Sequence, residues 1–375
     1  MAYFSKETEY FLYVLRCAIS GKTPEKPQGD LDWAELMTIS KKQEVYAVIA
    51  AVLPLEYLPG EIAATLNNYN KSELARLIAM KSELALLETD LEENGIRFML
   101  LKGSRIKAFY PRESMRQMSD IDILYDQTKR DSLIKIMKSH GYTLYSWSEN
   151  SDDFHKKPVY TFEFHRELFF DEFGFVPDFS FVWDNATVDS DNSCKYVMSD
   201  SDLYLHAIAH LYKHYVLGGV GVRFLMDIYL LLKKAKLDTA YIADRIGAME
   251  LTDFEKTVRE LSLALFDGDE LSEEQLAFLE VTVSFGVYGN SHKGRELQYE
   301  HFRESHGGST SMLRYTLSRI FPSSEYMHRT YRVLDKAPYL LPYFYVHRMI
   351  TKTITDGGRA TREIKEINEI NKKEQ

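Results

Sequence analysis

The chain has 375 residues and a formal net charge of −10, with 45% hydrophobic and 27% charged residues. This balance is typical of globular proteins, and the length predicts two or three packed parts. The acidic balance disfavours broad nucleic-acid binding, and no apolar run approaches the roughly 20 residues that span a bilayer.

Two further patterns concern the cellular location. The chain contains two cysteines, Cys17 and Cys194, far apart in the sequence. This usage disfavours a disulfide scaffold and is typical of a reducing compartment. The first residues, 1–7, lack the charged and then apolar pattern of a signal peptide. We therefore expect a cytoplasmic protein that does not bind membranes.

Residues 1–94 are predicted to form an N-terminal helical region. Apolar residues recur with helical spacing from Phe11 onward, and Asp32 is a suitable cap for a second helix. The apolar residues from Leu74 to Leu87 predict one long helix with a continuous apolar face. Asn94 and Gly95 are expected to end that helix.

Residues 95–200 alternate between short strands and helices. Strands are expected at 96–101, 119–125, 142–147 and 159–165, with helices at 104–110 and 128–140, a polar loop at 112–118 and a candidate strand at 167–175. Helical patterns return over 201–375. The fold class is therefore predicted to be α+β: a small mixed sheet flanked by N-terminal and C-terminal helical regions.

Two carboxylates in the second strand predict a metal site. Side chains alternate along a strand, so Asp120 and Asp122 share one face and Ile121 points to the other. Such a pair is costly in a cleft unless cations neutralise it. Mg²⁺ prefers oxygen ligands, and two ions about 4 Å apart can hold both the attacking and the leaving oxygens of a phosphoryl transfer.

A third carboxylate occurs in the strand expected at 159–165. There, Tyr160, Phe162 and Phe164 take one face, and Glu163 shares the other face with His165. A lone glutamate between aromatic residues suggests a ligand for the same metals.

A phosphate site is predicted where the first strand of this region ends. Gly103 allows close approach to the backbone, Ser104 supplies a hydroxyl donor, and Lys102 supplies charge. Arg116, in the following loop, could bind a phosphate or hold the loop in place. Arg223 and Asp227 are expected to pair within one helix.

These motifs resemble the nucleotidyltransferase superfamily with a polymerase-β-type core. The closer resemblance is to a bacterial family of uncharacterised nucleotidyltransferases, carried by Lys102-Gly103, Arg116, Ser119 to Asp122 and Glu163-Phe164-His165. It continues in segments 210–214, 223–227 and 321–323, and so covers most of the chain. The resemblance implies that Asp120 and Asp122 bind two metal ions and that Glu163 completes the site near the acceptor hydroxyl.

Further residues are candidates for binding the substrates. Lys102, Gly103, Ser104, Arg116 and Ser119 would surround the nucleotide phosphates. His165, His210 and His214 are candidate substrate contacts. His206, His210 and His214 recur every four residues, but ligands from consecutive turns of one helix do not readily surround a zinc ion, so zinc is disfavoured.

The expected activity is transfer of a nucleoside monophosphate, with AMP from ATP as the favoured case, to a hydroxyl with release of pyrophosphate. Two Mg²⁺ or Mn²⁺ ions would assist, and the acceptor would be a small molecule, a protein or a tRNA. The alternatives are a metal-dependent glycosyltransferase and a non-catalytic, antitoxin-like nucleotide-binding module. If the three carboxylates converge, neutralising any one of them should leave the metal-free protein at least as stable.

Overall fold

The computed structural model describes residues 4–147, 150–157, 160–169, 175–216, 219–286, 324, 327–328, 331–335 and 337–347. The chain separates into two compact units, residues 1–213 with 220–288 and residues 214–219 with 289–375. The predicted division at 94 and 200 stays a prediction. In the second unit, short 3-10 turns occupy Arg332–Asp335 and Pro338–Leu340, and a helix follows over 341–347.

The first unit begins with four helices, as expected. These are α1 (Lys6–Ile19), α2 (Trp33–Lys42), α3 (Tyr46–Val52) and α4 (Gly60–Glu93). The Asp32 carboxylate caps α2 by accepting hydrogen bonds from the backbone N–H groups of Ala34 and Glu35, each at 3.0 Å. Helix α4 ends at Glu93 with Asn94 as its C-cap, and Gly95 follows in a left-handed conformation with φ of 61°.

The apolar residues of α4 do not form the single buried face that the sequence suggested. Met80, Leu84 and Leu87 are buried against the sheet. In contrast, Leu74, Ile78 and Leu86 are 50%, 59% and 56% exposed. Successive residues are about 100° apart around a helix, so the adjacent Leu86 and Leu87 cannot both face one surface.

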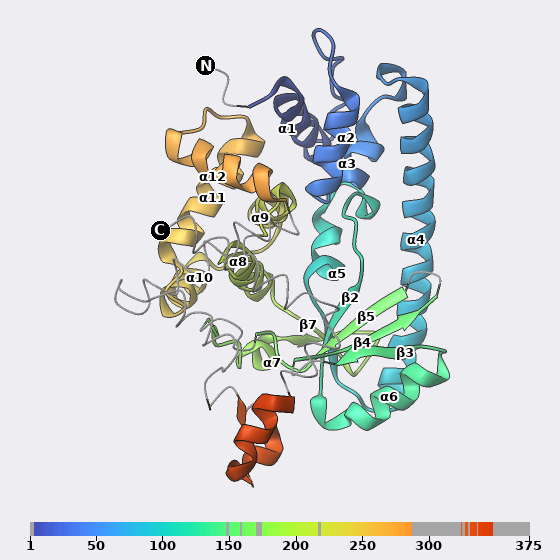
Figure 1. Ribbon diagram of the computed structural model, residues 1–375, viewed down its shortest axis with the longest axis vertical. Coiled ribbons are helices and arrows are strands. Elements are labelled where there is room, and N and C mark those ends of the chain that lie inside the picture. The colour runs from blue at the N-terminus through green and yellow to red at the C-terminus, as the bar shows by residue number, and fades with distance from the viewer. Residues whose placement is uncertain are drawn as a thin grey trace. The chain divides into compact units, whose positions relative to one another are not determined.

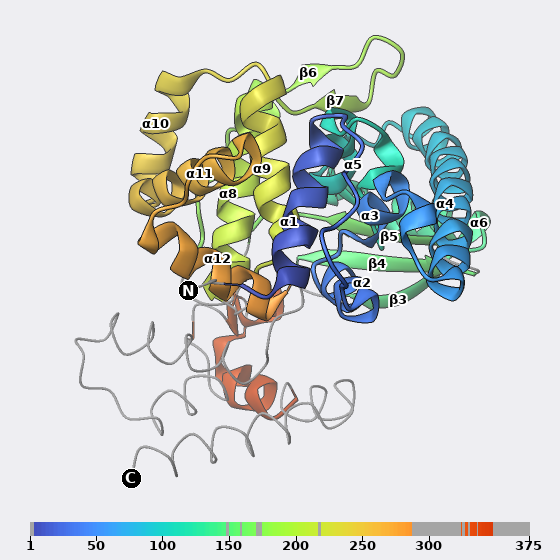
Figure 2. The same cartoon turned by 90° about the horizontal axis from the view of Figure 1, so that it is seen from above.

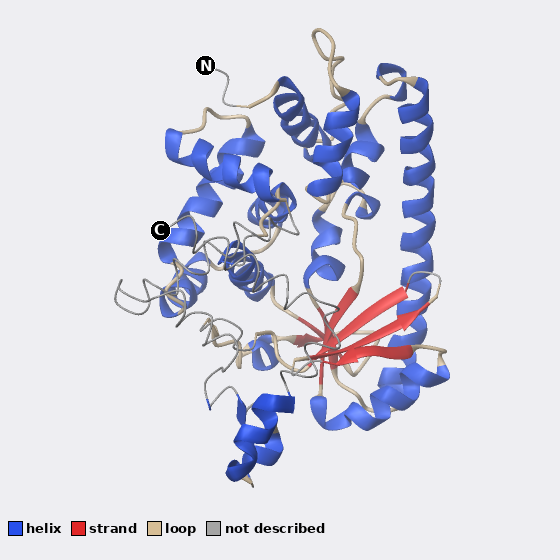
Figure 3. Ribbon diagram, viewed as in Figure 1, coloured by secondary structure: helices blue, strands red, loops and turns tan. Residues whose placement is uncertain are grey.

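Seven strands form one mixed sheet, coloured red in Figure 3. They are β1 (Phe98–Leu100), β2 (Ile121–Tyr125), β3 (Thr143–Trp147), β4 (Ser151–Lys156), β5 (Tyr160–His165), β6 (Thr187–Val188) and β7 (Lys195–Val197). Their order is β3-β4-β5-β2-β1-β7-β6. The β2–β5 and β1–β7 pairs are parallel, and the other neighbouring pairs are antiparallel.

The sheet confirms the expected mixed α+β class but contains strands that the sequence did not indicate. Strand β4 is polar, and it is held in the sheet because Arg130 and Arg166 neutralise the fully buried Asp152. The candidate strand at 167–175 is not found in its described residues, 167–169 and 175. The loop at 112–118 includes a 3-10 turn at Glu113–Met115.

One face of the sheet packs on α4 and on α6 (Arg130–Ser139). Phe154, Phe162 and Phe164 from the strands meet Leu87 and Leu133 in this core. Figure 1 shows α4 running beside the strands. The carboxylates of β2 and β5 therefore lie on the face turned away from this core.

The remaining helices are α5 (Lys102–Ile106), α7 (Val182–Asn185), α8 (Asp200–Val216), α9 (Val222–Lys234), α10 (Thr239–Ala248), α11 (Thr252–Asp267) and α12 (Glu273–Phe285), with 3-10 turns at Leu55–Tyr57, Lys107–Phe109 and Gln127–Lys129. Helices α8 to α12 group together, away from α4 (Figure 2). Among the described residues, no helix has the length and apolar content that crossing a membrane requires.

Candidate active site

The parallel pairing of β2 with β5 sets the geometry of the site. Its register places Asp122 opposite Glu163 and Ile121 opposite Phe162. Ile121 and Phe162 are buried in the core, so the alternation of side chains sends Asp122 and Glu163 to the other face. The two motifs thus meet as the alternation patterns indicated.

Asp122, Glu163 and His165 form a group that could hold a metal ion, since each offers one ligand atom and these atoms all lie within 4.8 Å of one another. The Nε2 atom of His165 is 2.8 Å from Oδ1 of Asp122 and 3.7 Å from Oε2 of Glu163. A divalent ion can bind such a mixture of carboxylate oxygen and imidazole nitrogen.

Asp120 lies just before β2 and is also close to this group. It shares a side-chain hydrogen bond with Glu163 and accepts one from Ser119. The structure therefore brings all three predicted carboxylates together, and it places Ser119 against one of them.

The three carboxyl groups differ in protonation. Burial raises the pKa of Glu163 to about 8, and the charges of Asp122 and Asp120 add to this effect. Burial also raises the pKa of Asp120, again with help from Asp122. Burial acts in the same direction on Asp122, but Lys102 and His165 outweigh it and hold that pKa well below its usual value. Asp122 is thus the firmly ionised member.

Lys102 is the counter-ion of Asp122. Its Nζ atom lies 2.6 Å from Oδ1 of Asp122, the same oxygen that His165 contacts. The backbone of Lys102 is left-handed, with φ of 44°, a conformation that costs a non-glycine residue about 1 kcal/mol or more. In this structure the lysine contacts the buried carboxylate of Asp122.

The hydroxyl of Ser104 is buried without a partner. The residue is 9% exposed, and its Oγ has no hydrogen bond to any described residue. The Ser104 N–H donates to the Leu101 carbonyl at 3.1 Å, so the hydroxyl is the group left to bind a ligand. A buried hydroxyl without a partner is costly, and a ligand oxygen would supply one.

Gly103 has a structural reason to be glycine. A Cβ atom at this position would lie 2.1 Å from Nη1 of Arg116 and 3.0 Å from the sulfur of Met118. The missing side chain is therefore needed for the approach of Arg116, whether or not a phosphate also binds there.

Arg116 holds its loop to α9. Its Nε and Nη2 atoms donate to the two carboxylate oxygens of Asp227 at 2.9 and 2.7 Å, and Tyr110 donates to Oδ1 of Asp227 at 2.7 Å. Of the two roles considered for Arg116, holding the loop is the one seen, and a phosphate contact stays a prediction. The expected Arg223–Asp227 pair is wrong, because Arg223 pairs with Glu44.

The histidines of α8 take different positions. His206 is 1% exposed and packs on Phe169 and Phe179, with ring centroids 5.6 and 6.0 Å away. Burial, helped by the positive charge of Lys102, lowers the pKa of His206 to about 3, so the ring is neutral. The His210 ring lies 6.0 Å from those of His206 and Phe224. His214 belongs to the second compact unit.

The family can be assigned from residues 29–267, which match a family model described as uncharacterised nucleotidyltransferase. The chain belongs to this family. The match includes every residue of the site described above. No curated protein matches the chain. Membership in this family supports the general class of the protein, which is that of transferases of nucleotidyl groups. Segment 321–323, which contributed to the resemblance, lies outside both the match and the described residues.

Sequence reasoning missed three features of this family member's site. Asp227 and Tyr110 fix Arg116, and Lys102 pairs with Asp122. The sequence motifs included Lys102, Gly103 and Arg116, but the partners of these residues lie far away in the chain. A buried ion pair of this kind leaves no local pattern in the sequence.

Replacing Gly103 with alanine tests the packing of Arg116. Gly103→Ala should lower the free energy of unfolding by about 2 kcal/mol, because the new methyl group displaces a buried, ion-paired guanidinium. Urea unfolding measures this loss. Gly247→Ala is the matched control, since a Cβ there meets nothing within 4 Å, and it should stabilise α10 by about 0.5–1 kcal/mol. Equal effects would contradict the role assigned to Gly103.

The carboxylates should respond differently to neutralisation in EDTA. Glu163→Gln should be more stable than wild type, and its advantage should grow from pH 5 to pH 8, because ionising the wild-type carboxyl at its raised pKa of about 8 costs stability. Since the Glu163 side chain is 29% exposed, we expect about 1–2 kcal/mol at pH 8.

The expectation that every neutral variant is at least as stable must be revised for Asp122. Asp122→Asn should lose about 3 kcal/mol at pH 7, because Lys102 would lose its buried counter-charge. The wild-type contribution of Asp122 disappears as pH falls toward its lowered folded-state pKa, so the loss should shrink in acid. Thermal melts across pH measure both variants, and parallel behaviour would show that the two carboxylates share one role.

Proposed function

We propose that the chain is a metal-dependent nucleotidyltransferase that moves a nucleoside monophosphate, foremost AMP from ATP, to an acceptor hydroxyl. The observation that carries the proposal is the convergence of Asp120, Asp122 and Glu163 on one face of the β2–β5 pair. The acceptor oxygen would attack the α-phosphorus, the bond to the bridging oxygen would break, and pyrophosphate would leave.

The residues fit the divalent ions that this reaction needs. Asp120, Asp122 and Glu163 would hold Mg²⁺ or Mn²⁺, and two such ions would neutralise charge on the phosphate oxygens. His165 adds a nitrogen ligand to the group. Imidazole suits transition metals better than Mg²⁺, so the arrangement favours good activity with Mn²⁺.

A phosphate oxygen of the nucleotide would accept a hydrogen bond from the hydroxyl of Ser104, which has no partner among the described residues. This atom is buried, and Gly103 and Ser104 open the short helix that follows β1. Once the metal ions are bound, the ammonium group of Lys102 would leave Asp122 and contact a phosphate instead. Arg116 would act by holding the loop through Asp227.

One group is placed to accept the proton of the acceptor hydroxyl when its ring does not bind a metal ion. His165 lies beside Asp122 and Glu163, which would hold the metal ions. Their neighbour His206 is neutral and enclosed by aromatic rings, so it would shape the site and would not carry charge. The acceptor itself would be a small molecule, a protein or a tRNA, and incubation of cell fractions with α-labelled nucleotides would identify it.

Nucleotide binding should depend on metal. ATP with Mg²⁺ or Mn²⁺ should raise the melting temperature much more than ATP with EDTA, because a ligand of the folded state stabilises it. Asp120→Asn, Asp122→Asn and Glu163→Gln should each reduce pyrophosphate release by about 100-fold or more. Asp131→Asn, on the exposed side of α6, is the control and should keep full activity. Equal melting shifts with and without metal would count against the proposal.

Lys102 should compete with the metal for Asp122. Lys102→Met removes the ammonium group that lies 2.6 Å from this carboxylate, so Mn²⁺ should bind at least about tenfold more tightly in the absence of nucleotide. Electron paramagnetic resonance of free Mn²⁺ measures the affinity directly. The control is Lys135→Met in α6, which should leave it unchanged. Weaker Mn²⁺ binding by Lys102→Met would show that the lysine organises the metal site.

A further inference from the structure

Strand β4 brings a fourth acidic side chain to the face that carries the candidate active site. Its antiparallel register with β5 places Asp153 directly opposite Glu163. Phe154 is buried in the core with Phe162, so the alternation of side chains sends Asp153 to the same face as Glu163. The Cβ atoms of directly opposed residues lie about 4.5–5.5 Å apart, so the two acids are neighbours. Burial is the main cause of the raised pKa of Glu163, and the charge of Asp153 is one of the smaller contributions.

The order of the strands puts Asp153 on the side of the site away from the phosphate loop. The strands run β4-β5-β2-β1 across this part of the sheet. Ser104, whose buried hydroxyl has no partner among the described residues, follows β1, while Asp122 and Glu163 lie on the two middle strands. The attacking and leaving oxygens of a phosphoryl transfer are roughly in line. A nucleotide with its leaving phosphates at Ser104 would therefore receive its acceptor from the side of β4.

An aromatic surface adjoins Asp153 on this side. His155 lies two residues further along β4, opposite Thr161, and so shares the face of Asp153. The Tyr145 ring of the edge strand β3 stacks on the His155 ring, with centroids 4.3 Å apart and an angle of 7° between the planes. Tyr145 is 73% exposed, so the outer side of the stack is accessible. Two residues of a strand cover about 7 Å, a span that one sugar ring can bridge.

The positive charges of the β4–β5 hairpin are used on the other face of the sheet or lie at its turn. Lys156 pairs with Glu83 of α4 at 2.8 Å. Arg166, directly after β5, pairs with the buried Asp152 at 2.8 Å. Lys157 lies in an exposed turn directly after β4. The face of the hairpin that carries the site is therefore the acidic one.

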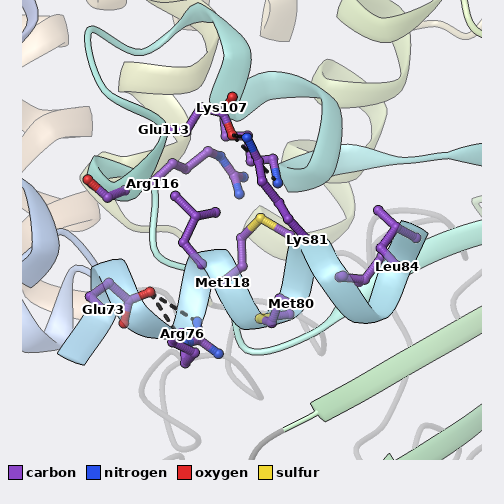
Figure 4. A pocket seen from close by; sticks show the side chains of 12 residues that line it. Glu73, Arg76, Met80, Lys81, Leu84, Lys107, Glu113, Arg116 and Met118 are labelled. Atoms are coloured by element: carbon purple, nitrogen blue, oxygen red, sulfur yellow. Dashed lines mark hydrogen bonds and ion pairs between the residues drawn. The ribbon is translucent and has the colours of Figure 1, made fainter. Parts of the chain in front are cut away.

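Charges near α4 are also balanced within the protein. Between α4 and the segment 107–118, Arg76 pairs with Glu73 at 3.2 Å, and Lys81 pairs with Glu113 at 2.7 Å (Figure 4). These pairs create no need for a charged ligand on that side of the sheet. The acidic face beside the candidate metal site is thus the better place for a ligand of opposite charge.

We propose that the flank formed by Asp153, His155 and Tyr145 binds the acceptor, and that the acceptor is a small hydroxylated molecule with an ammonium group, such as an amino sugar. Asp153 would bind the ammonium group, the ring would lie on the Tyr145–His155 stack, and a hydroxyl would face the metal ions. An acidic flank repels phosphates and so disfavours a tRNA as acceptor. The inference rests on the proposed nucleotidyl transfer, since that reaction requires an acceptor.

Glucosamine, glucose and glucose 6-phosphate test the proposal, because they share one ring and differ in charge. Saturation-transfer NMR on the full chain, with Mg²⁺ and an α,β-methylene analogue of ATP, measures their binding at slightly acidic pH, where the amino group of glucosamine is charged. Glucosamine should bind at least about tenfold more tightly than glucose, and glucose 6-phosphate more weakly than glucose. Equal binding of the three sugars, or binding of none, would overturn the proposal.

Two variants assign the parts of the flank. Asp153→Asn should abolish the preference for glucosamine over glucose, because it keeps the shape of the side chain and removes its charge. Asp131→Asn, exposed on α6, is the matched control and should keep the preference. Tyr145→Ser should weaken glucosamine and glucose by the same factor, since the stack contacts the ring and not the ammonium group. A preference that survives in Asp153→Asn would contradict the role of this carboxylate.

The melting shift caused by the ATP analogue with Mg²⁺ separates this inference from the proposed function. Asp153→Asn should keep the shift of the wild type, because Asp153 would contact the acceptor and not the nucleotide. A wild-type protein without a metal-dependent shift would overturn the proposed function and the inference together. A normal shift without a preference for glucosamine would overturn the inference alone. Loss of the shift in Asp153→Asn would show that Asp153 supports the metal site instead.

Discussion

The burial of a negative charge on Asp122 is the constraint on which the site depends. The residue is 6% exposed and stays ionised, so the fold must supply positive charge next to it. Lys102 does so, and His165 contacts the same carboxylate oxygen. Burial, together with that fixed charge, raises the pKa values of the nearby Glu163 and Asp120. The charges in the site are thus coupled, because each group shifts the pKa of its neighbours.

A second buried ion pair stabilises the loop next to this site. Arg116 and Asp227 join the loop before β2 to α9, and the guanidinium fits only because position 103 has no side chain. The glycine, the arginine and the aspartate therefore depend on one another, although they are far apart in the sequence. Such a pair contributes more to defining one arrangement of the loop than to net stability.

The features that follow from local periodicity could be predicted from the sequence. The alternation of Asp122 with Ile121 and of Glu163 with Phe162 predicted which side chains share a face, and the structure has that arrangement. The cap at Asp32 was equally local. The sequence did not reveal β4, because the polar residue Asp152 suits a strand only when distant arginines neutralise it. The partner of Arg116 was missed for the same reason, since long-range ion pairs have no spacing rule.

The parallel register of β2 and β5 has a consequence for how the protein is made. Parallel neighbours cannot be joined by a tight turn, and here α6, β3 and β4 lie between them in the chain. Asp122 therefore emerges from the ribosome well before its partner Glu163, and contacts between distant residues form slowly. Until β5 docks, the nascent chain carries an aspartate pair without the third carboxylate. Assembly of the candidate site is thus tied to completion of the central sheet, so a chain that stops short of β5 lacks Glu163 and His165.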